Sequence, residues 1–250
     1  MRYINYLMIG CFFWLGWMFA EAKRNKVSNE FLDVKNLPNS FSGRSIFFIS
    51  DIHFRRISKK VIQTASCADL VIIGGDLMEK GVPFPRVKKN IQKLKSIGPV
   101  VFVWGNNDME ENPEKLAQLL REEGVTVLEN SVYMWNRQKE NIWIAGAGNR
   151  RQTVDKSLLH SCRSDDTILL ALHDPAFIKE MDHKEKLSAA FAGHTHGGQI
   201  RIGRFSLREK GGWRFSGEFP LLISNGYGTT KLPFRFGAPA QTHLITLKKK

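Results

Sequence analysis

The 250-residue sequence predicts an α/β fold in which two β-sheets carry helices on their outer faces. Its short, continuous apolar runs are rich in β-branched and aromatic residues, which is typical of strands buried on both faces. Early in the chain, segments with helical spacing separate these runs, and later several strand-like runs follow one another closely. A chain of this length can bury one sizeable core, so we expect one folded domain.

Residues 1–22 are predicted to form an uncleaved N-terminal transmembrane anchor. The segment from Tyr6 to Ala20 is almost continuously apolar, and counted from Tyr3 it reaches the minimum of roughly 17 residues for a span. A cleaved signal peptide is the alternative, because Ala20-Glu21-Ala22 has the small-x-small pattern of a cleavage site. The single basic residue before the apolar segment, Arg2, disfavours that alternative.

Basic residues follow the apolar segment at Lys23, Arg24 and Lys26. By the positive-inside rule they place the rest of the chain on the cytoplasmic side of the cell membrane, an orientation that cleavage would reverse. Residues 23–44 are mostly polar and are interpreted as a tether, with an edge strand around Phe31 to Val34.

Further elements are predicted from spacing and from start and stop signals. Helices are expected over residues 57–67, 86–97 and 113–124. Strands are expected over residues 125–128, 132–135 and 142–145. Asp174 and Pro175 suit the N-cap and first position of a short helix to Met181, so Asp174 is interpreted as structural. Apolar residues of the tail are assigned to the core: Ile200, Ile202, Phe205, Phe215 and Leu221 to Ile223.

Potential metal ligands follow the carboxyl ends of the strand-like runs, where sites form in sheets of this kind. The pairs of run and motif are Ser45–Ser50 with Asp51-Ile52-His53, Leu70–Ile73 with Gly74-Gly75-Asp76, Val100–Trp104 with Gly105-Asn106-Asn107-Asp108, Ile168–Leu172 with His173-Asp174-Pro175, and Leu187–Ala192 with Gly193-His194-Thr195-His196-Gly197-Gly198-Gln199. If the last run is a strand, His194 and His196 project to the same side of its end. Two imidazoles placed in this way favour a metal site.

This ordered set of motifs resembles the calcineurin-like metallophosphoesterases, from about Ile46 to the C-terminus. The segments 193–199 and 224–228 look most like the bacterial membrane-associated branch of that family, which includes UDP-diacylglucosamine pyrophosphatase-like members. The resemblance implies a four-layer αββα sandwich of two mixed sheets flanked by helices, with the phosphoesterase domain spanning residues 45–250.

The resemblance also implies two metal ions and assigns their ligands. One ion would be held by Asp51, His53, Asp76 and His196, and the other by Asp76, Asn106, His173 and His194. Imidazole, carboxylate and amide ligands without thiolate favour manganese, with iron or zinc as alternatives. Such a pair generates a hydroxide that hydrolyses a phosphodiester or pyrophosphate bond. Asp76, Asn106 and His173 are therefore also candidate catalytic residues.

One position departs from the family pattern, because Asn107 stands where a histidine is usual. In relatives that histidine is thought to assist the leaving oxygen, and an amide cannot transfer a proton in this pH range. Asn107 therefore remains a candidate catalytic residue of a different kind, and the role of Asp108 beside it is open. We predict a preference for stable leaving groups such as a phosphate. A harmless variant, with the metals carrying the rate, is the alternative.

The formal net charge of +13 favours a negatively charged partner: a phosphorylated substrate, which can be lipid-linked, and a membrane surface. A specific nucleic-acid partner is not expected, because the basic residues are dispersed without aromatic alternation. Two other functions remain open, a metal-binding scaffold or sensor with impaired catalysis and, from charge alone, a nuclease. Arg150 and Arg151 either contact a substrate phosphate or lie on a solvated face.

Remaining residues carry no predicted chemistry. The three cysteines form no disulfide framework and are interpreted as small buried hydrophobes: Cys11, Cys67 and Cys162. The histidines outside the motifs are interpreted as surface or packing residues: His160, His183 and His243.

Overall fold

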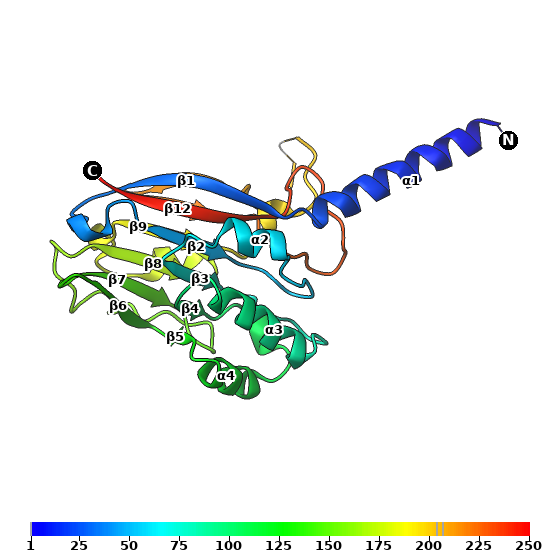
Figure 1. Cartoon of the computed structure of the whole chain (residues 1–250). Helices are drawn as coiled ribbons and strands as arrows, with labels where there is room; N and C mark the ends of the chain where they lie inside the picture. Colours follow the sequence, from blue (N-terminus) through cyan, green and yellow to red (C-terminus); the bar gives the residue numbers. More distant parts are fainter. Residues whose placement is uncertain (1, 204, 207) are drawn as a thin grey trace.

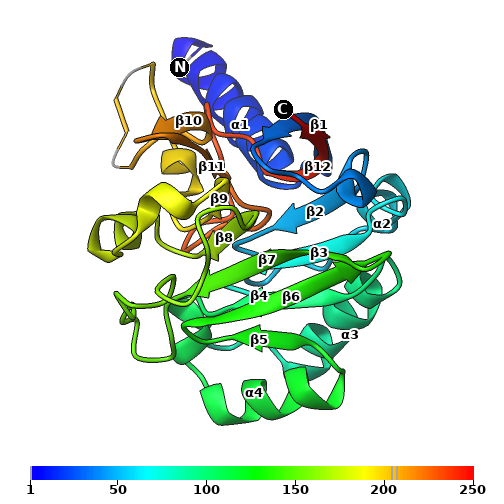
Figure 2. The same ribbon diagram turned by 90° about the vertical axis from the view of Figure 1, so that its left-hand side faces the viewer.

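The computed structural model describes residues 2–203, 205–206 and 208–250 and shows two six-stranded mixed sheets packed face to face (Figures 1 and 2). The first sheet has the order β1 (Lys26–Val34), β12 (Gln241–Lys249), β2 (Ser45–Ile49), β3 (Leu70–Gly74), β4 (Val100–Val103) and β5 (Thr126–Leu128). The second has the order β10 (Gly212–Ser216), β11 (Phe219–Ile223), β9 (Ala189–Ala192), β8 (Ile168–Leu172), β7 (Glu140–Ala147) and β6 (Ser131–Arg137). The predicted α/β class with two mixed sheets is confirmed.

Parallel pairing brings the predicted motifs to common sheet edges. Strands β2 to β5 run parallel, as do β7, β8, β9 and β11, whereas β12 pairs antiparallel with β2. Ile49 and Ile73 are register partners, as are Ile73 and Phe102, so the carboxyl ends of β2, β3 and β4 lie side by side.

Three apolar layers hold the sheets and their coverings together. The outer face of the first sheet packs against α2 (Lys59–Thr64), α3 (Phe84–Lys95) and α4 (Pro113–Glu122). Between the sheets, Phe48 and Phe191 are fully buried, with ring centroids 5.8 Å apart, and each such ring contributes roughly 1.5–3 kcal/mol by leaving water. The outer face of the second sheet is covered by loops and the 3₁₀ helix η3 (Pro175–Glu180), and a second 3₁₀ helix, η4 (Lys184–Lys186), has no buried residue. The short helix expected after Asp174 is thus a 3₁₀ helix, and Asp174 caps it by accepting the Ala176 N–H at 2.9 Å.

The N-terminal helix α1 (Arg2–Ala22) projects from the body, which its last turns contact (Figure 1). Within the described residues, no helix is both long and apolar enough to cross a membrane, so the expectation of a transmembrane anchor is corrected. The apolar run from Tyr6 to Ala20 is shorter than the roughly 20 residues that a span needs. Trp14 and Trp17 pack edge-on against Phe236, each with ring centroids 5.5 Å from it.

The structure also differs from the expectations for the tether, for the tail and for the cysteines. In the stretch interpreted as a tether, the edge strand begins at Lys26 and pairs along its length with β12. Four tail residues assigned to the core are exposed: Ile200, Ile202, Phe205 and Phe215. They lie on loops or on the edge strand β10. Cys11 and Cys67 are exposed and only Cys162 is buried, because the first two lie on the projecting helix and in a surface turn.

Candidate metal centre

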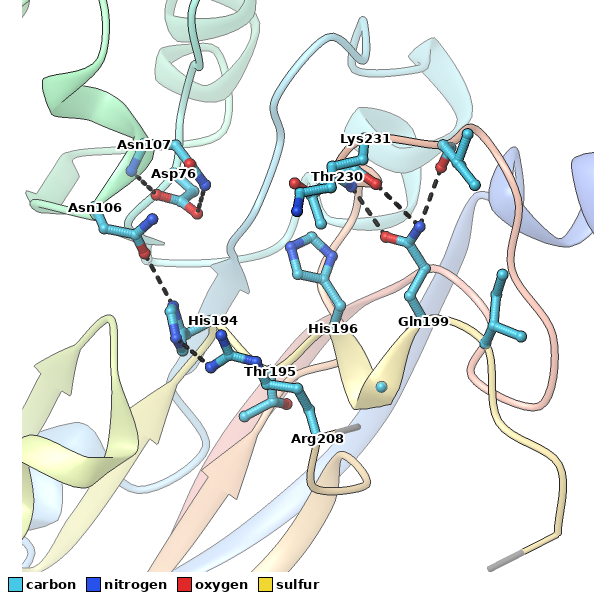
Figure 3. A pocket seen from close by; sticks show the side chains of 13 residues that line it. Asp76, Asn106, Asn107, His194, Thr195, His196, Gln199, Arg208, Thr230 and Lys231 are labelled. Atoms are coloured by element: carbon cyan, nitrogen blue, oxygen red, sulfur yellow. Dashed lines mark hydrogen bonds between the residues drawn. The ribbon is translucent and has the colours of Figure 1, made fainter. Parts of the chain in front are cut away.

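The predicted ligands come together at the carboxyl ends of strands from both sheets. Each follows one strand: Asp51 and His53 follow β2, Asp76 follows β3, Asn106 follows β4, His173 follows β8, and His194 and His196 follow β9. Figure 3 shows Asp76, Asn106, His194 and His196 facing one cavity. The packing of the two sheets therefore joins motifs that are far apart in the sequence.

Four buried side chains form the first cluster: Asp51, His53, Asp76 and His196. Each offers one ligand atom, and these atoms all lie within 4.8 Å of one another. The Nε2 atoms of His53 and His196 are 3.2 Å apart, and His196 Nε2 lies 3.4 Å from Asp51 Oδ1. Imidazole nitrogens and carboxylate oxygens at these separations can converge on one divalent ion.

The remaining predicted ligands form a second cluster that shares Asp76. His173 Nε2 lies 3.2 Å from Asp76 Oδ2 and 3.2 Å from His194 Nδ1. His194 Nδ1 lies 2.9 Å from Asn106 Oδ1. Asp76 thus lies between two groups of donors, as a bridging carboxylate requires.

The backbone at the centre is held in an uncommon conformation. Five of the residues have the positive φ of the left-handed region: Asp51 (54°), His53 (50°), Asp76 (52°), His194 (67°) and His196 (51°). Non-glycine residues reach this region rarely, at a cost of about 1–3 kcal/mol each, and such strain clusters at functional sites. At Gly193 a side chain is excluded by lack of space, because a Cβ atom would come 2.7 Å from Asp51 Oδ2.

A sequence model of the calcineurin-like phosphoesterase family matches residues 44–198, which is more than half of the chain. The chain belongs to this family. The resemblance inferred from the motifs is confirmed, and the chain is a hydrolase of the phosphoesterase class. Its place in the membrane-associated branch stays a prediction.

Individual relatives support the same family. YpbG, an uncharacterised protein of Bacillus subtilis, is 38% identical over 235 residues, which cover 92% of this chain and 90% of that protein. The phosphodiesterase YaeI of Escherichia coli is 27% identical over 169 residues, 63% of this chain and 62% of that protein. Among solved structures, the sulfate thiohydrolase SoxB of Thermus thermophilus has a TM-score of 0.52 at 11% identity, covering 85% of this chain and 57% of that one, which shows a shared fold.

In this phosphoesterase, the ring nitrogens of two candidate ligands that face away from the cavity have partners of their own. The Nδ1 atom of His173 donates to the carbonyl of Gly74 at 2.9 Å, which directs Nε2 into the cavity. Glu79 Oε2 lies 3.1 Å from His53 Nδ1, within ion-pair distance. Partners of this kind fix the ring orientation of a metal-binding histidine. Together with the mixed oxygen and nitrogen donor set, they show that these residues fit divalent metal ions.

Arg235 is a fully buried arginine next to His196. Its guanidinium donates to the carbonyls of His196 and Ala238 at 3.0 and 2.8 Å, and to those of Asn225 and Gly228 at 2.6 Å each. Burial lowers its pKa to about 10, which still leaves it charged at neutral pH. Hydrogen bonds from Arg235 therefore connect the loop after β9 to the loop after β11.

Asp108 has a structural role. Its Oδ2 atom accepts the backbone N–H groups of Asp76 and Gly105 at 2.9 Å each, and its Oδ1 atom accepts that of Met78 at 3.0 Å. Burial, followed by the nearby charge of Asp76, raises its pKa to about 7 despite these donors. Asp108 joins the loops after β3 and β4, which answers the question left open by the sequence.

The charges at the centre are strongly coupled without metal. Burial opposes protonation of His173, but the charge of Asp76 and its hydrogen bond outweigh it and raise the pKa to about 10. Burial would raise the pKa of Asp76, yet His173 and His53 lower it instead. Burial lowers the pKa of His196 to about 3, which keeps that imidazole neutral and available as a ligand.

A cavity of about 500 Å³ opens above the centre. Residues that the sequence analysis did not assign to the site line it, among them Gln199, Ile200, Arg208, Lys231 and Leu232. Arg208 donates to His194 Nε2 at 2.6 Å. No helical or strand periodicity marks these loop residues, so no sequence pattern pointed to them beyond the Gln that ends the glycine-rich motif.

Phosphate contact and a solvated face were the two alternatives for Arg150 and Arg151. Arg150 pairs with Glu129 at 3.1 Å, and the described residues that line the cavity include neither Arg150 nor Arg151. His243, expected to be a surface or packing residue, is buried, and its Nδ1 lies 2.8 Å from Glu30.

Proposed function

We propose that this phosphoesterase hydrolyses a phosphodiester or pyrophosphate bond with the help of two divalent metal ions, most favourably manganese. The observation that carries the proposal is the convergence of the two donor clusters on one cavity through Asp76. In the proposal Asp51, His53, Asp76 and His196 hold one ion, and Asp76, Asn106, His173 and His194 hold the other. When bound, such a pair lowers the pKa of water and neutralises charge on the phosphoryl group.

The protein groups around the centre set its substrate preference. Asn107 donates to Asp76 and lies at the cavity wall, where it can hold a phosphoryl oxygen by a hydrogen bond. It cannot protonate a departing alkoxide. A leaving phosphate needs no such help, because its second pKa is about 6. The proposal therefore favours phosphoanhydrides and activated diesters over alkyl monoesters.

The test uses the full chain, because the Arg235 N–H donates to the Met18 carbonyl of α1 at 3.0 Å and truncation would remove that contact. The protein is stripped of metal, manganese is added back, and hydrolysis of an activated aryl phosphodiester is followed. Metal content per chain is measured in parallel. We expect two ions per chain and turnover that depends on them.

The matched control is Asp76→Asn, which keeps the size of the side chain and removes the shared charge. Turnover should be lost and the metal content should fall. Two bound ions without hydrolysis of any diester would favour the metal-binding scaffold, with Asn107 as the explanation. Cleavage of DNA or RNA with a steep salt dependence would favour a nuclease.

We propose in addition that the enzyme acts at a membrane surface on an amphiphilic, lipid-linked phosphate. Exposed aromatic and aliphatic side chains of α1, such as Phe12 and Phe13, and the exposed Ile200 and Leu232 at the cavity support the proposal. Sedimentation with anionic vesicles tests membrane binding, and a Phe12→Ser/Phe13→Ser variant that binds equally well would contradict it.

A further inference from the structure

Lys231 is held in a strained position at the edge of the metal cavity. Its φ is 60°, in the left-handed region that a residue with a side chain rarely adopts. The exposed side chain lines the cavity (Figure 3), and no ion pair found among the described residues involves it. Strain of this kind persists only where the surroundings determine the conformation.

Gln199, at the end of the glycine-rich motif, holds the backbone around Lys231 in this conformation. Its Oε1 atom accepts the N–H of Thr230 at 3.0 Å, and its Nε2 atom donates to the carbonyls of Thr230 and Leu232 at 3.0 and 3.1 Å. One amide thus binds the backbone on both sides of Lys231 (Figure 3). The ammonium is presented from a fixed loop.

A second cavity of about 440 Å³ adjoins the first, and Asn107, Thr230 and Lys231 line both. Lys231 therefore stands at the boundary between the metal centre and this neighbouring space. Arg208 lines the metal cavity and its guanidinium contacts His194, as Figure 3 shows. A substrate held by Lys231 would extend from the metals into the second cavity.

Among the described residues that line the second cavity, four are basic and two are acidic: Lys23, Arg55, Lys80 and Lys231, with Glu79 and Glu110. Lys23 and Lys80 line it, and burial together with the neighbouring Arg55 lowers the pKa of Lys23, as in an electropositive environment. Glu79 lies within ion-pair distance of His53, whereas Glu110 accepts the backbone N–H of Lys80 at 3.3 Å and keeps its charge, so basic side chains remain in excess. The cavity is therefore suited to an anionic group.

We propose that Lys231 binds a second, non-reacting phosphate of the substrate, so that the enzyme selects diphosphate diesters over simple phosphodiesters. This inference rests on the proposed function and narrows its substrate class. Water would form a new bond to one phosphorus while the bridging P–O bond breaks. The products are two phosphomonoesters, and the protons of water pass to the products or to solvent. Gln199 is a positioning residue for Lys231.

The experiment compares two substrates, P1,P2-diphenyl diphosphate and bis(4-nitrophenyl) phosphate, in the manganese-loaded full chain. Lys231→Met should raise KM for the diphosphate about tenfold more than for the diester, as loss of one charge-assisted hydrogen bond predicts. Lys231→Arg should retain most of the discrimination. Lys60→Met, on the exposed start of α2, is the matched control and should change neither KM.

Gln199→Ala should give the same selective rise in KM, and the Gln199→Ala/Lys231→Met double variant should be no worse than Lys231→Met alone. Additive losses would assign Gln199 a separate structural role and overturn its positioning of Lys231. Equal changes of KM for both substrates in Lys231→Met would overturn the second-phosphate site.

A binding measurement separates this inference from the proposed function. Methylenediphosphonate, which is not hydrolysed, is titrated calorimetrically into the metal-free wild-type and Lys231→Met proteins. Weaker binding by the variant supports the site even if the wild type shows no turnover, in which case only the proposed function fails. Equal binding, with wild-type turnover intact, overturns the site alone.

Discussion

Asn107 donates its side-chain Nδ2 to Asp76 Oδ2 at 2.6 Å, and its backbone N–H donates to Asp76 Oδ1 at 2.8 Å. The residue that departs from the family pattern is thus bound at two points to the carboxylate shared by both clusters. These two hydrogen bonds orient Asp76. The amide of Asn107 stands at the sequence position where the family pattern has a histidine, which could donate a proton.

Replacing Asn107 by histidine should add a proton donor at this point. We expect Asn107→His to raise the rate on alkyl phosphomonoesters relative to aryl diesters, by up to about 100-fold, the lower range for general acid catalysis. The ratio of kcat/KM for the two substrate types is the measurement. An unchanged ratio would show that the metals carry the rate without assistance from this position.

Glu79 should support metal binding through His53. Glu79→Gln removes the charge 3.1 Å from His53 Nδ1 and should weaken metal affinity by about 10–100-fold. Metal titration followed by calorimetry measures the change. Glu110→Gln is the control, because Glu110 lines the same neighbouring cavity but bonds the backbone of Lys80. Equal affinities for the Glu79 variant and the wild type would contradict a role in orienting His53.

Metal binding should release a proton from His173. Its pKa in the metal-free protein is about 10, so the ring is protonated at neutral pH and a metal must displace that proton. Affinity should therefore rise with pH until about pH 10. Calorimetry in buffers of different ionisation enthalpy counts the protons, and His173→Gln should release about one fewer. Equal counts for the two proteins would show that His173 is neutral before binding.

The same pKa shift has a consequence for stability. A folded pKa raised above the unfolded value of 6.5 stabilises the metal-free protein fully below that value, and the contribution is lost as pH rises through about 10. Urea unfolding of the metal-free protein between these limits should show a decline that His173→Gln lacks. The decline should disappear when metal is added, because the ring is then neutral at all these pH values.

The strands and the candidate ligands at their carboxyl ends could be predicted because local sequence carries the signal for both. Continuous apolar runs mark buried parallel strands, and the carboxyl ends of such strands meet, so the approach of Asp51 to Asp76 follows from pairing alone. The approach of His173 and His194 to Asp76 required the second sheet to pack on the first, which the family resemblance supplied and periodicity did not.

The loop residues at the site could not be predicted from the sequence, and the reason is physical. Gln199 reaches Thr230, and Arg235 reaches His196, through loops without periodic structure, so no pattern records these contacts. Phe205 was assigned to the core because it is apolar, yet it lies on a loop and is 84% exposed.

Arg235 should be required for the stability of the site. Its guanidinium is fully buried and serves the carbonyls of the loops that carry His196 and Asn225. Arg235→Met fills similar space but leaves those carbonyls without donors, so the free energy of unfolding should fall by about 3 kcal/mol or more. Urea unfolding of the metal-free protein gives the value without any contribution from bound ions. Arg121→Met, on the exposed face of α4, is the matched control and should stay within about 0.5 kcal/mol of the wild type. If both variants unfold alike, the loops after β9 and β11 are held by their other contacts, and Arg235 is not their fastening point.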